Sequence, residues 1–319
     1  KKAAERKGKV QLINASNLST KMRKSLGSKR NYLTEAEIAT ITQNYGDFVA
    51  VDTLANDGET EQQKPFASKI FDSHEFGYRR VTIERPLRLS AQITDSAIAA
   101  LRFAPKPFNA VMQSIDAQLG TAFGTAWTAE TYGQLQDVAL EVRALIKAEF
   151  PELKEKDIKE VLDSKIWLLQ KALMEKTQAL QDVIGTEQFD DFNQFDEVLK
   201  KALKQTDIKL DAKEKKQLLD AITWKNPEAE PVINKVLKQA ENPLYGQFSY
   251  QGKVVEFVQD GDLRDAENIA LNPKVSTTEL IEDYFKREVQ PHVADAWINA
   301  DKRDEKDGET GIVGYEIPF

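Results

Sequence analysis

The stretch Glu75–Leu89, EFGYRRVTIERPLRL, is the clearest strand signal in the chain. Apolar and polar residues alternate along it, with Val81, Ile83, Leu87 and Leu89 at odd positions and Arg80, Thr82 and Glu84 at even ones. A two-residue period is typical of a strand with one buried and one solvated face. Pro86 cannot donate a ladder hydrogen bond, so we expect the strand to end there or to run along a sheet edge.

Four arginines are concentrated in the same stretch: Arg79, Arg80, Arg85 and Arg88. Charge runs are most often solvated faces. The alternative interpretation is contact with phosphate groups or with an acidic partner. Under that alternative, Arg79 and Arg80 are candidate DNA contacts.

The run FGYRRVTIERPLRL resembles a segment of the modification (M) subunits of type I restriction–modification systems, which are adenine-N6 DNA methyltransferases. Three further runs resemble the family and follow its order. They are RKGKVQLINA with KMRKSLGSKR in Arg6–Arg30, FVQDGDLRDAENIAL at Phe257–Leu271, and YFKREVQPHVADAWI followed by GYEIPF near the C-terminal end. The resemblance covers both ends of the chain and leaves the long middle without a signature.

This resemblance implies a parent protein that transfers a methyl group from S-adenosylmethionine to adenine N6. It implies that the methyltransferase core lies upstream, so that this chain is a C-terminal fragment without a cofactor of its own. The implied partners are the specificity subunit, the restriction subunit and, in the full complex, double-stranded DNA. The run GYEIPF continues further in the family, so we expect Phe319 to be a truncation.

Composition is that of an ordinary globular protein. The 319 residues are 41% hydrophobic and 30% charged, which suits two domains or one domain with an insertion. The absence of cysteine excludes disulfides, thiolate zinc sites and a cysteine nucleophile, and it suits the cytoplasm. No apolar run approaches 18 residues, so we expect no membrane association.

Charge is distributed unevenly along the chain. Residues 1–30 carry ten Lys and Arg and one acid, a net charge of +9, which leaves −17 for the remainder of a chain whose total is −8. We expect a short basic helix, capped by Ser16 or Asn17 and ending at Gly27. The candidate phosphate contacts of the basic segment, in and just after this helix, are Lys21, Arg23, Lys24, Lys29 and Arg30. A basic terminus is equally compatible with a solvated tail.

The predicted fold class is α+β and predominantly α. From Thr128 to Glu241 apolar residues recur at threes and fours, as in Ile166, Leu169, Leu173, Leu180 and Ile184. We therefore expect a helical bundle at 126–241, including a short helix at Val232–Leu237. Small mixed α/β segments with a few antiparallel strands flank it, at 1–125 (continuing from the upstream core) and 242–319. That these two flanks pack against each other is a further hypothesis.

Individual elements are also expected in the flanks. Thr34 and Glu37 form a capping-box pattern at a helix start. Residues 69–72 and 77–89 are expected to pair as strands, and 51–64 to form a loop. A hairpin is expected from residues 247–250 and 253–258, and a helix over Thr278–Val289 followed by a C-terminal strand.

No pattern in the chain specifies catalysis. Adenine methyltransferases need a glycine-rich cofactor turn and an Asn/Asp-Pro-Pro-aromatic loop that holds the flipped base. The nearest match, Asn242-Pro243-Leu244-Tyr245, lacks the second proline and is better explained as a helix terminator leading into the hairpin. The two histidines, His74 and His292, are far apart, and the Asp clusters at 260–262 and 301–307 lack calcium-loop order. We assign no catalytic, cofactor or metal residue.

Binding is the function class that remains. The resemblance places Tyr284, Phe285, His292 and Trp297 where the specificity subunit would be contacted, and aromatic anchors suit such an interface. They suit a hydrophobic core equally well. The predicted function is subunit assembly with DNA clamping, and the alternative is a stand-alone helical adaptor unrelated to methylation.

Overall fold

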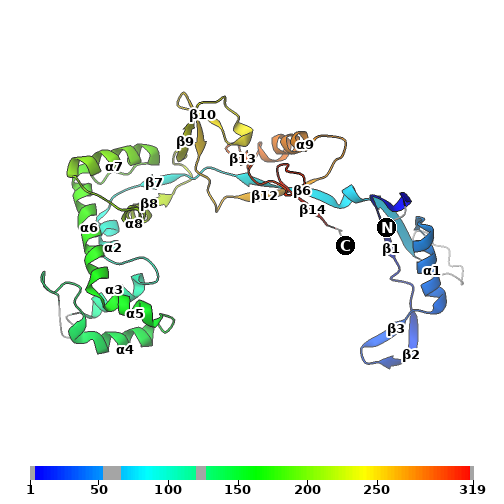
Figure 1. Cartoon of the computed structure of the whole chain (residues 1–319), viewed down its shortest axis with the longest axis horizontal. Coiled ribbons are helices and arrows are strands. Elements are labelled where there is room, and N and C mark those ends of the chain that lie inside the picture. Colours follow the sequence, from blue (N-terminus) through cyan, green and yellow to red (C-terminus); the bar gives the residue numbers. More distant parts are fainter. Residues whose placement is uncertain (1–3, 53–65, 120–126, 317–319) are drawn as a thin grey trace. The chain divides into compact units, whose positions relative to one another are not determined.

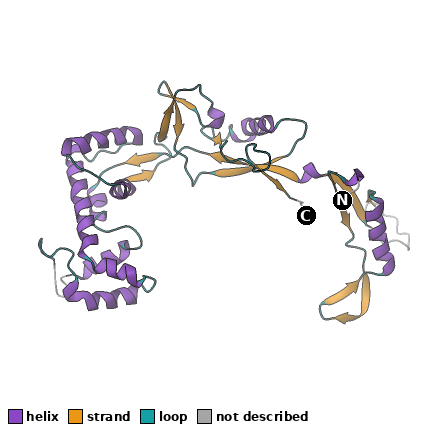
Figure 2. Ribbon diagram, in the orientation of Figure 1, coloured by secondary structure: helices purple, strands orange, loops and turns teal. Residues whose placement is uncertain are grey.

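The computed structural model describes residues 4–52, 66–119 and 127–316. The chain forms two compact units, one built from residues 1–84, 242–246 and 263–319 and the other from 85–241 and 247–262. Helices and antiparallel sheets are both present, which confirms the mixed α/β expectation in its coarse form (Figures 1 and 2). The expected loop at 51–64 falls mostly outside the described residues.

The N-terminal part of the first unit is a small sheet with a helix. The antiparallel sheet has the order β1-β5-β4, with bounds Lys9–Asn14, Ala67–Asp72 and Val51–Asp52. Helix α1 (Glu35–Asp47) packs beside β1. The capping box is confirmed: Glu37 N donates to the Thr34 hydroxyl, and Thr34 N donates to the Glu37 carboxylate.

The expected basic helix is wrong, because this segment is a β-hairpin. Strands β2 (Thr20–Leu26) and β3 (Lys29–Tyr32) pair antiparallel. Gly27 lies in the turn with φ +61°, a left-handed conformation that glycine adopts freely and that short hairpin turns require. The same glycine that suggested a helix end is the turn residue of the hairpin.

Strand β6 (Gly77–Glu84) is the centre of the second sheet in this unit. It pairs with β12 (Asp265–Ala270) on one side and with β13 (Trp297–Ile298) and β14 (Ile312–Tyr315) on the other. The strand ends before Pro86 as expected, but it is not an edge, and β5 pairs with β1 and β4 rather than with β6. Strands from the two sequence flanks, residues 1–125 and 242–319, therefore share one sheet. These strands pack together as hypothesised.

One helix covers this sheet. Helix α9 (Thr277–Tyr284) continues into a π-helical turn, Phe285–Val289. The buried cluster between helix and sheet comprises Val81, Ile83, Ile269, Ile281, Phe285, Val289, Ala296 and Ile298. The 3₁₀ turn Pro243–Tyr245 adds Leu244 and Tyr245 to its margin.

The second unit holds most of the helices (Figure 2). Their bounds are Asp95–Ala100 (α2), Asn109–Gln118 (α3), Ala139–Glu149 (α4), Glu155–Leu162 (α5), Ser164–Ile184 (α6), Phe192–Thr206 (α7) and Ala212–Ile222 (α8). The longest helix, α6, packs against α2, α5, α7 and α8. Its apolar stripe serves two cores, with Trp167 in one and Leu173 and Leu180 in the other.

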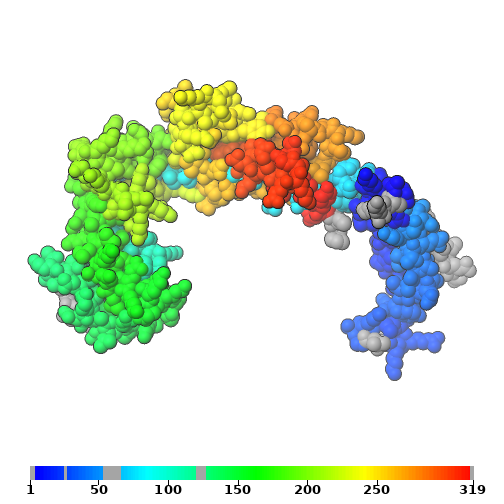
Figure 3. All heavy atoms as spheres, viewed as in Figure 1, coloured from blue at the N-terminus to red at the C-terminus, as the bar shows by residue number. Residues whose placement is uncertain are grey.

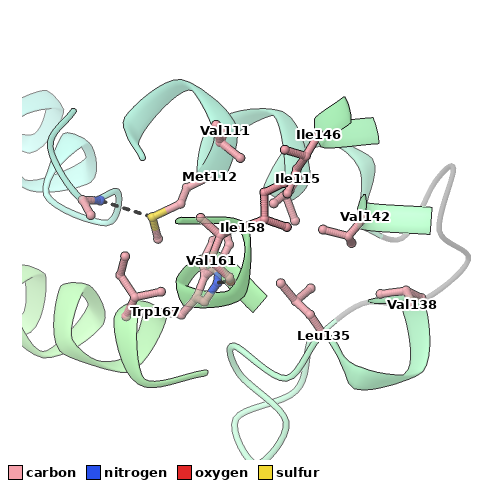
Figure 4. Packing of buried hydrophobic residues seen from close by; sticks show 12 residues of the cluster. Val111, Met112, Ile115, Leu135, Val138, Val142, Ile146, Ile158, Val161 and Trp167 are labelled. Carbon is pink, nitrogen blue, oxygen red and sulfur yellow. Dashed lines mark hydrogen bonds between the residues drawn. The ribbon is translucent and has the colours of Figure 1, made fainter. Parts of the chain in front are cut away.

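The core at the N-terminal end of α6 is drawn in Figure 4. Side chains from α3, α4 and α5 meet there, including Val111, Ile115, Val142 and Val161, all at most 1% exposed. Trp167 is fully buried, and its indole N–H donates to the Val161 carbonyl at 2.8 Å. The buried polar group is thus satisfied, as close packing requires.

Short strands complete the second unit. β7 (Leu89–Ala91) pairs with β8 (Thr223–Lys225). β10 (Phe248–Tyr250) and β11 (Lys253–Phe257) form the expected hairpin, and β9 (Ile233–Leu237) joins it as a third strand. The helix expected at residues 232–237 is wrong: the pairing with β11 overrides a weak helical pattern in a segment rich in β-branched residues.

Candidate functional site

The β2–β3 hairpin carries a dense cluster of positive charge. Thr20–Tyr32 contains five basic residues and no acidic residue. All five side chains are exposed: Lys21, Arg23, Lys24, Lys29 and Arg30. Within the described part of the chain no carboxylate forms an ion pair with any of them. The hairpin lies at the surface of the N-terminal part in the space-filling view (Figure 3).

Strand geometry distributes these charges over both faces of the hairpin. Consecutive residues in a strand point to opposite sides, so Arg23 and Lys24 are on different faces, as are Lys29 and Arg30. A two-stranded ribbon of this kind fits the major groove of B-form DNA, where its side chains reach phosphates on either side.

The base of the hairpin is fixed by α1. Glu37 is buried, with 8% of its surface exposed, and its Oε1 accepts a hydrogen bond from the Thr20 hydroxyl at 3.1 Å. Its Oε2 accepts from Thr34 N at 2.7 Å. Leu18, two residues before the start of β2, is 4% exposed. One carboxylate therefore holds both the start of α1 and the start of the hairpin.

Other cations of the N-terminal segment are committed to internal contacts. The Arg6 guanidinium lies 4.7 Å from the ring centroids of both Tyr45 and Phe48 and donates to the Gly46 carbonyl at 2.8 Å. Lys9 pairs with Asp72 at 2.6 Å. Arg6 and Lys9 are therefore engaged within the fold, whereas the basic side chains of the hairpin are free to contact a ligand.

Arg79 and Arg80 have opposite environments despite being neighbours. Arg79 shares the inward face of β6 with Val81 and is 4% exposed. Its guanidinium contacts Asp307 at 2.5 Å and donates to the carbonyls of Thr310 and Gly311. Arg79 is thus a structural residue that orders the 301–310 loop, and its role as a DNA contact is not supported. Arg80 is exposed.

The four C-terminal candidates separate in the same way. Phe285 and Trp297 are 1% and 5% exposed and take the core role rather than the interface role. Tyr284 is half-buried and donates to Glu267 at 2.8 Å; burial, followed by that carboxylate, raises its pKa to about 12. His292 is exposed. Tyr284 and His292 are the members of this set that a partner can reach.

The Asn242-Pro243-Leu244-Tyr245 segment forms a short 3₁₀ turn within the first unit. The Tyr245 hydroxyl donates to Glu282 at 3.1 Å, and the ring packs at the margin of the sheet core. The expected link to the hairpin is present, but the element before the turn is strand β9, so the segment does not terminate a helix. Its aromatic ring has a structural role.

The aspartates at 260–262 and at 301–307 form ion pairs and hydrogen bonds within the fold. Asp260 and Asp262 both pair with Lys225, Asp262 at 2.5 Å. Asp304 accepts from the backbone N–H groups of Lys306 and Val313. Within residues 4–52, 66–119 and 127–316, no three His, Asp or Glu side chains are arranged to hold a metal ion.

One buried charge network gave no signal in the sequence. Glu84, expected on the wet face of its strand, is fully buried and accepts from Arg264 Nε at 2.9 Å and from Asn299 at 2.7 Å. Its partners lie about two hundred residues away in sequence, and only the pairing of β6 with β12 and β13 brings them together. Alternation within a single strand does not reveal such partners.

No protein-family profile, curated protein or solved structure matches this chain. Among the described residues, no helix has the length and apolar character needed to cross a membrane.

Proposed function

We propose that this chain is the non-catalytic C-terminal portion of a type I restriction–modification M subunit. In this proposal it contacts the phosphate backbone of double-stranded DNA through the β2–β3 hairpin and assembles with the specificity and restriction subunits. The full protein would transfer methyl from S-adenosylmethionine to adenine N6 in the cytoplasm. The observation that carries the DNA-binding role is the hairpin: five exposed cations without ion-pair partners in the described residues, on a two-stranded ribbon anchored at its base.

The family assignment rests on the four ordered sequence runs. What supports the non-catalytic role is that Tyr245, the aromatic residue of the closest motif, is engaged with Glu282 in a structural turn. We also propose that residues 126–241 are organised as a predominantly α-helical bundle. Its support is the packing of α5, α7 and α8 around α6.

A duplex-binding titration tests this function. Fluorescence anisotropy of a labelled 30-base-pair duplex is measured at several salt concentrations between 50 and 200 mM. Five phosphate contacts predict a slope of about −4.5 in a plot of log affinity against log salt. Salt-independent binding, or no binding at low salt, would contradict the proposal. Calorimetry with S-adenosylmethionine should show no binding, and micromolar affinity would overturn the non-catalytic assignment.

The second candidate is a stand-alone helical adaptor. It is favoured by apolar side chains left exposed on helices of the second unit, Leu140 at 81% and Leu169 at 52%. The coding sequence upstream of Lys1 discriminates between the two. A glycine-rich strand–turn and an Asn-Pro-Pro-aromatic loop there would support the methyltransferase, and an upstream sequence without them would support the adaptor.

A further inference from the structure

A pocket of about 840 Å³ lies in the second unit, between the ends of α2 and α3, residues 127–132 and the middle of α6. This volume is within the roughly 300–1,000 Å³ typical of small-molecule sites. Its apolar lining includes Phe103, Leu119, Trp127 and Met174. The residues belong to one unit, so the pocket does not depend on how the two units are placed.

The walls of the pocket combine aromatic rings with cations. Trp127 and Tyr132 pack with ring centroids 4.8 Å apart, and Trp127 is held by a hydrogen bond from its indole N–H to the Gln134 carbonyl at 2.9 Å. Lys171 Nζ lies 4.8 Å from the centroid of the Tyr132 ring. Trp127 also packs on Trp167, with ring centroids 4.7 Å apart, so the aromatic wall of the pocket is held in place by its own contacts.

The charges of the pocket favour an anion. The described lining residues include Arg102, Lys171 and a single carboxylate, Asp116, for a net charge of +1. Arg102 pairs with Asp116 through Nη2 at 2.5 Å and approaches the Tyr132 hydroxyl through Nε at 3.4 Å. These contacts orient its guanidinium and leave further N–H donors on it. The Lys171 side chain is 31% exposed, and its contacts are the Tyr132 ring and Glu175 at 3.9 Å, so its ammonium has N–H donors left for an anionic ligand.

We propose that this pocket binds a base-plus-phosphate ligand: a nucleoside monophosphate, or the phosphorylated end of a single strand. The base would pack against the apolar lining at Phe103, Leu119 and Met174, beside the Trp127–Tyr132 pair. The phosphate would contact Lys171, which would leave the Tyr132 ring, and the free donors of Arg102. Asp116 can accept from an exocyclic amino group. This site is separate from the hairpin and does not rest on its DNA-binding role.

Calorimetry on the whole chain tests the pocket, with AMP, adenosine and inorganic phosphate as probes at low salt. We expect saturable AMP binding that is at least fivefold tighter than that of either adenosine or phosphate. Lys171→Met, which keeps the aliphatic stem, should weaken AMP about tenfold. Lys165→Met, an exposed lysine on the same helix outside the pocket, should leave affinity unchanged. Circular dichroism confirms that both variants are folded.

Four outcomes in the titrations with AMP, adenosine and phosphate would count against the proposal. Equal affinity for AMP and adenosine would show that the phosphate makes no contact. Equal affinity for AMP and phosphate would show that the base makes none. An absence of AMP binding at millimolar concentration would overturn the site, as would an equal loss in both lysine variants. A 5′-phosphorylated oligothymidine that binds more tightly than a mononucleotide, and that loses affinity in Lys171→Met, would identify a strand end as the ligand of the pocket. Oligothymidine affinity that is unchanged in Lys171→Met would belong to the hairpin and would count against the pocket.

Discussion

The Glu37 carboxylate accepts a hydrogen bond from the Thr20 hydroxyl at 3.1 Å while closing the capping box of α1 on Thr34. Two elements that are separate in sequence are thereby joined through one buried acid. The orientation of the basic hairpin relative to its own helix depends on this contact. The side chain that stabilises the fold also positions the candidate DNA-binding surface.

Glu37→Ala should therefore have two effects. Loss of the capping box and of the Thr20 contact is expected to cost about 1–2 kcal/mol of stability. Looser anchoring of the hairpin should also weaken duplex DNA binding several-fold. Urea denaturation and anisotropy measure the two effects. Glu35→Ala, in the same helical turn but outside the capping box, is the control; if it matched Glu37→Ala in both assays, the anchoring role would be wrong.

Arg79 and Arg80 provide a matched pair on one strand. Arg79→Leu should destabilise the protein by about 2–3 kcal/mol, because it removes charged hydrogen bonds to Asp307 and to two carbonyls. Arg80→Leu should change stability by no more than about 0.5 kcal/mol, since that side chain is exposed. Urea denaturation compares the two variants, and equal effects would contradict the assigned environments.

The 301–310 loop should respond to acid. The hydrogen bond from Arg79, followed by one from the backbone, lowers the pKa of Asp307; backbone hydrogen bonds lower the pKa of Asp304. Carboxyls with lowered folded-state pKa values stabilise the protein above their unfolded pKa, about 3.9, and lose that contribution as pH falls through the folded value. The free energy of unfolding should thus decrease as the pH is lowered below about 4. Asp307→Asn should flatten this dependence, and an unchanged pH profile would count against the ion pair.

The sheet around β6 should survive removal of the second unit. Ile83 pairs with Asp265, so Glu84 and Leu263 can be joined by a short Asn-Gly turn in place of residues 85–262. The deletion also removes residues 242–246 of the first unit, so it loses the cover of Leu244 and Tyr245 and the Tyr245–Glu282 hydrogen bond, but it keeps the buried cluster between α9 and the sheet. We expect a cooperative urea transition by circular dichroism. A gradual, non-cooperative transition would show that this sheet does not fold by itself.

Sequence periodicity predicted the elements whose partners lie nearby in the chain. The helix at residues 164–184, the hairpin at 248–257 and the capping box at Thr34 follow from local patterns and are present. Parity along β6 also places Arg79 on the inward face with Val81, a consequence that the charge of the residue obscured.

The remaining features depend on distant partners. The burial of Glu84 depends on its hydrogen bonds with Arg264 and Asn299. The pairing of β6 with three strands depends on segments nearly two hundred residues or more away in the sequence. The pocket between Arg102 and Lys171 likewise arises only when α2, α3 and α6 are packed. Gly27 serves equally well as a helix end and as a hairpin turn, so the local sequence of the basic segment does not distinguish a helix from a hairpin.

The central claim is that the hairpin supplies the contacts to DNA phosphates, and one comparison tests it. The first variant replaces Lys21, Arg23, Lys24, Lys29 and Arg30 by Gln. The control replaces five exposed lysines of the second unit by Gln: Lys156, Lys201, Lys204, Lys213 and Lys216. Both change net charge equally. Duplex affinity is measured by anisotropy as a function of salt. The account predicts that the hairpin variant loses most of its affinity and salt slope while the control keeps both; equal losses in the two variants, or an unaffected hairpin variant, would contradict it.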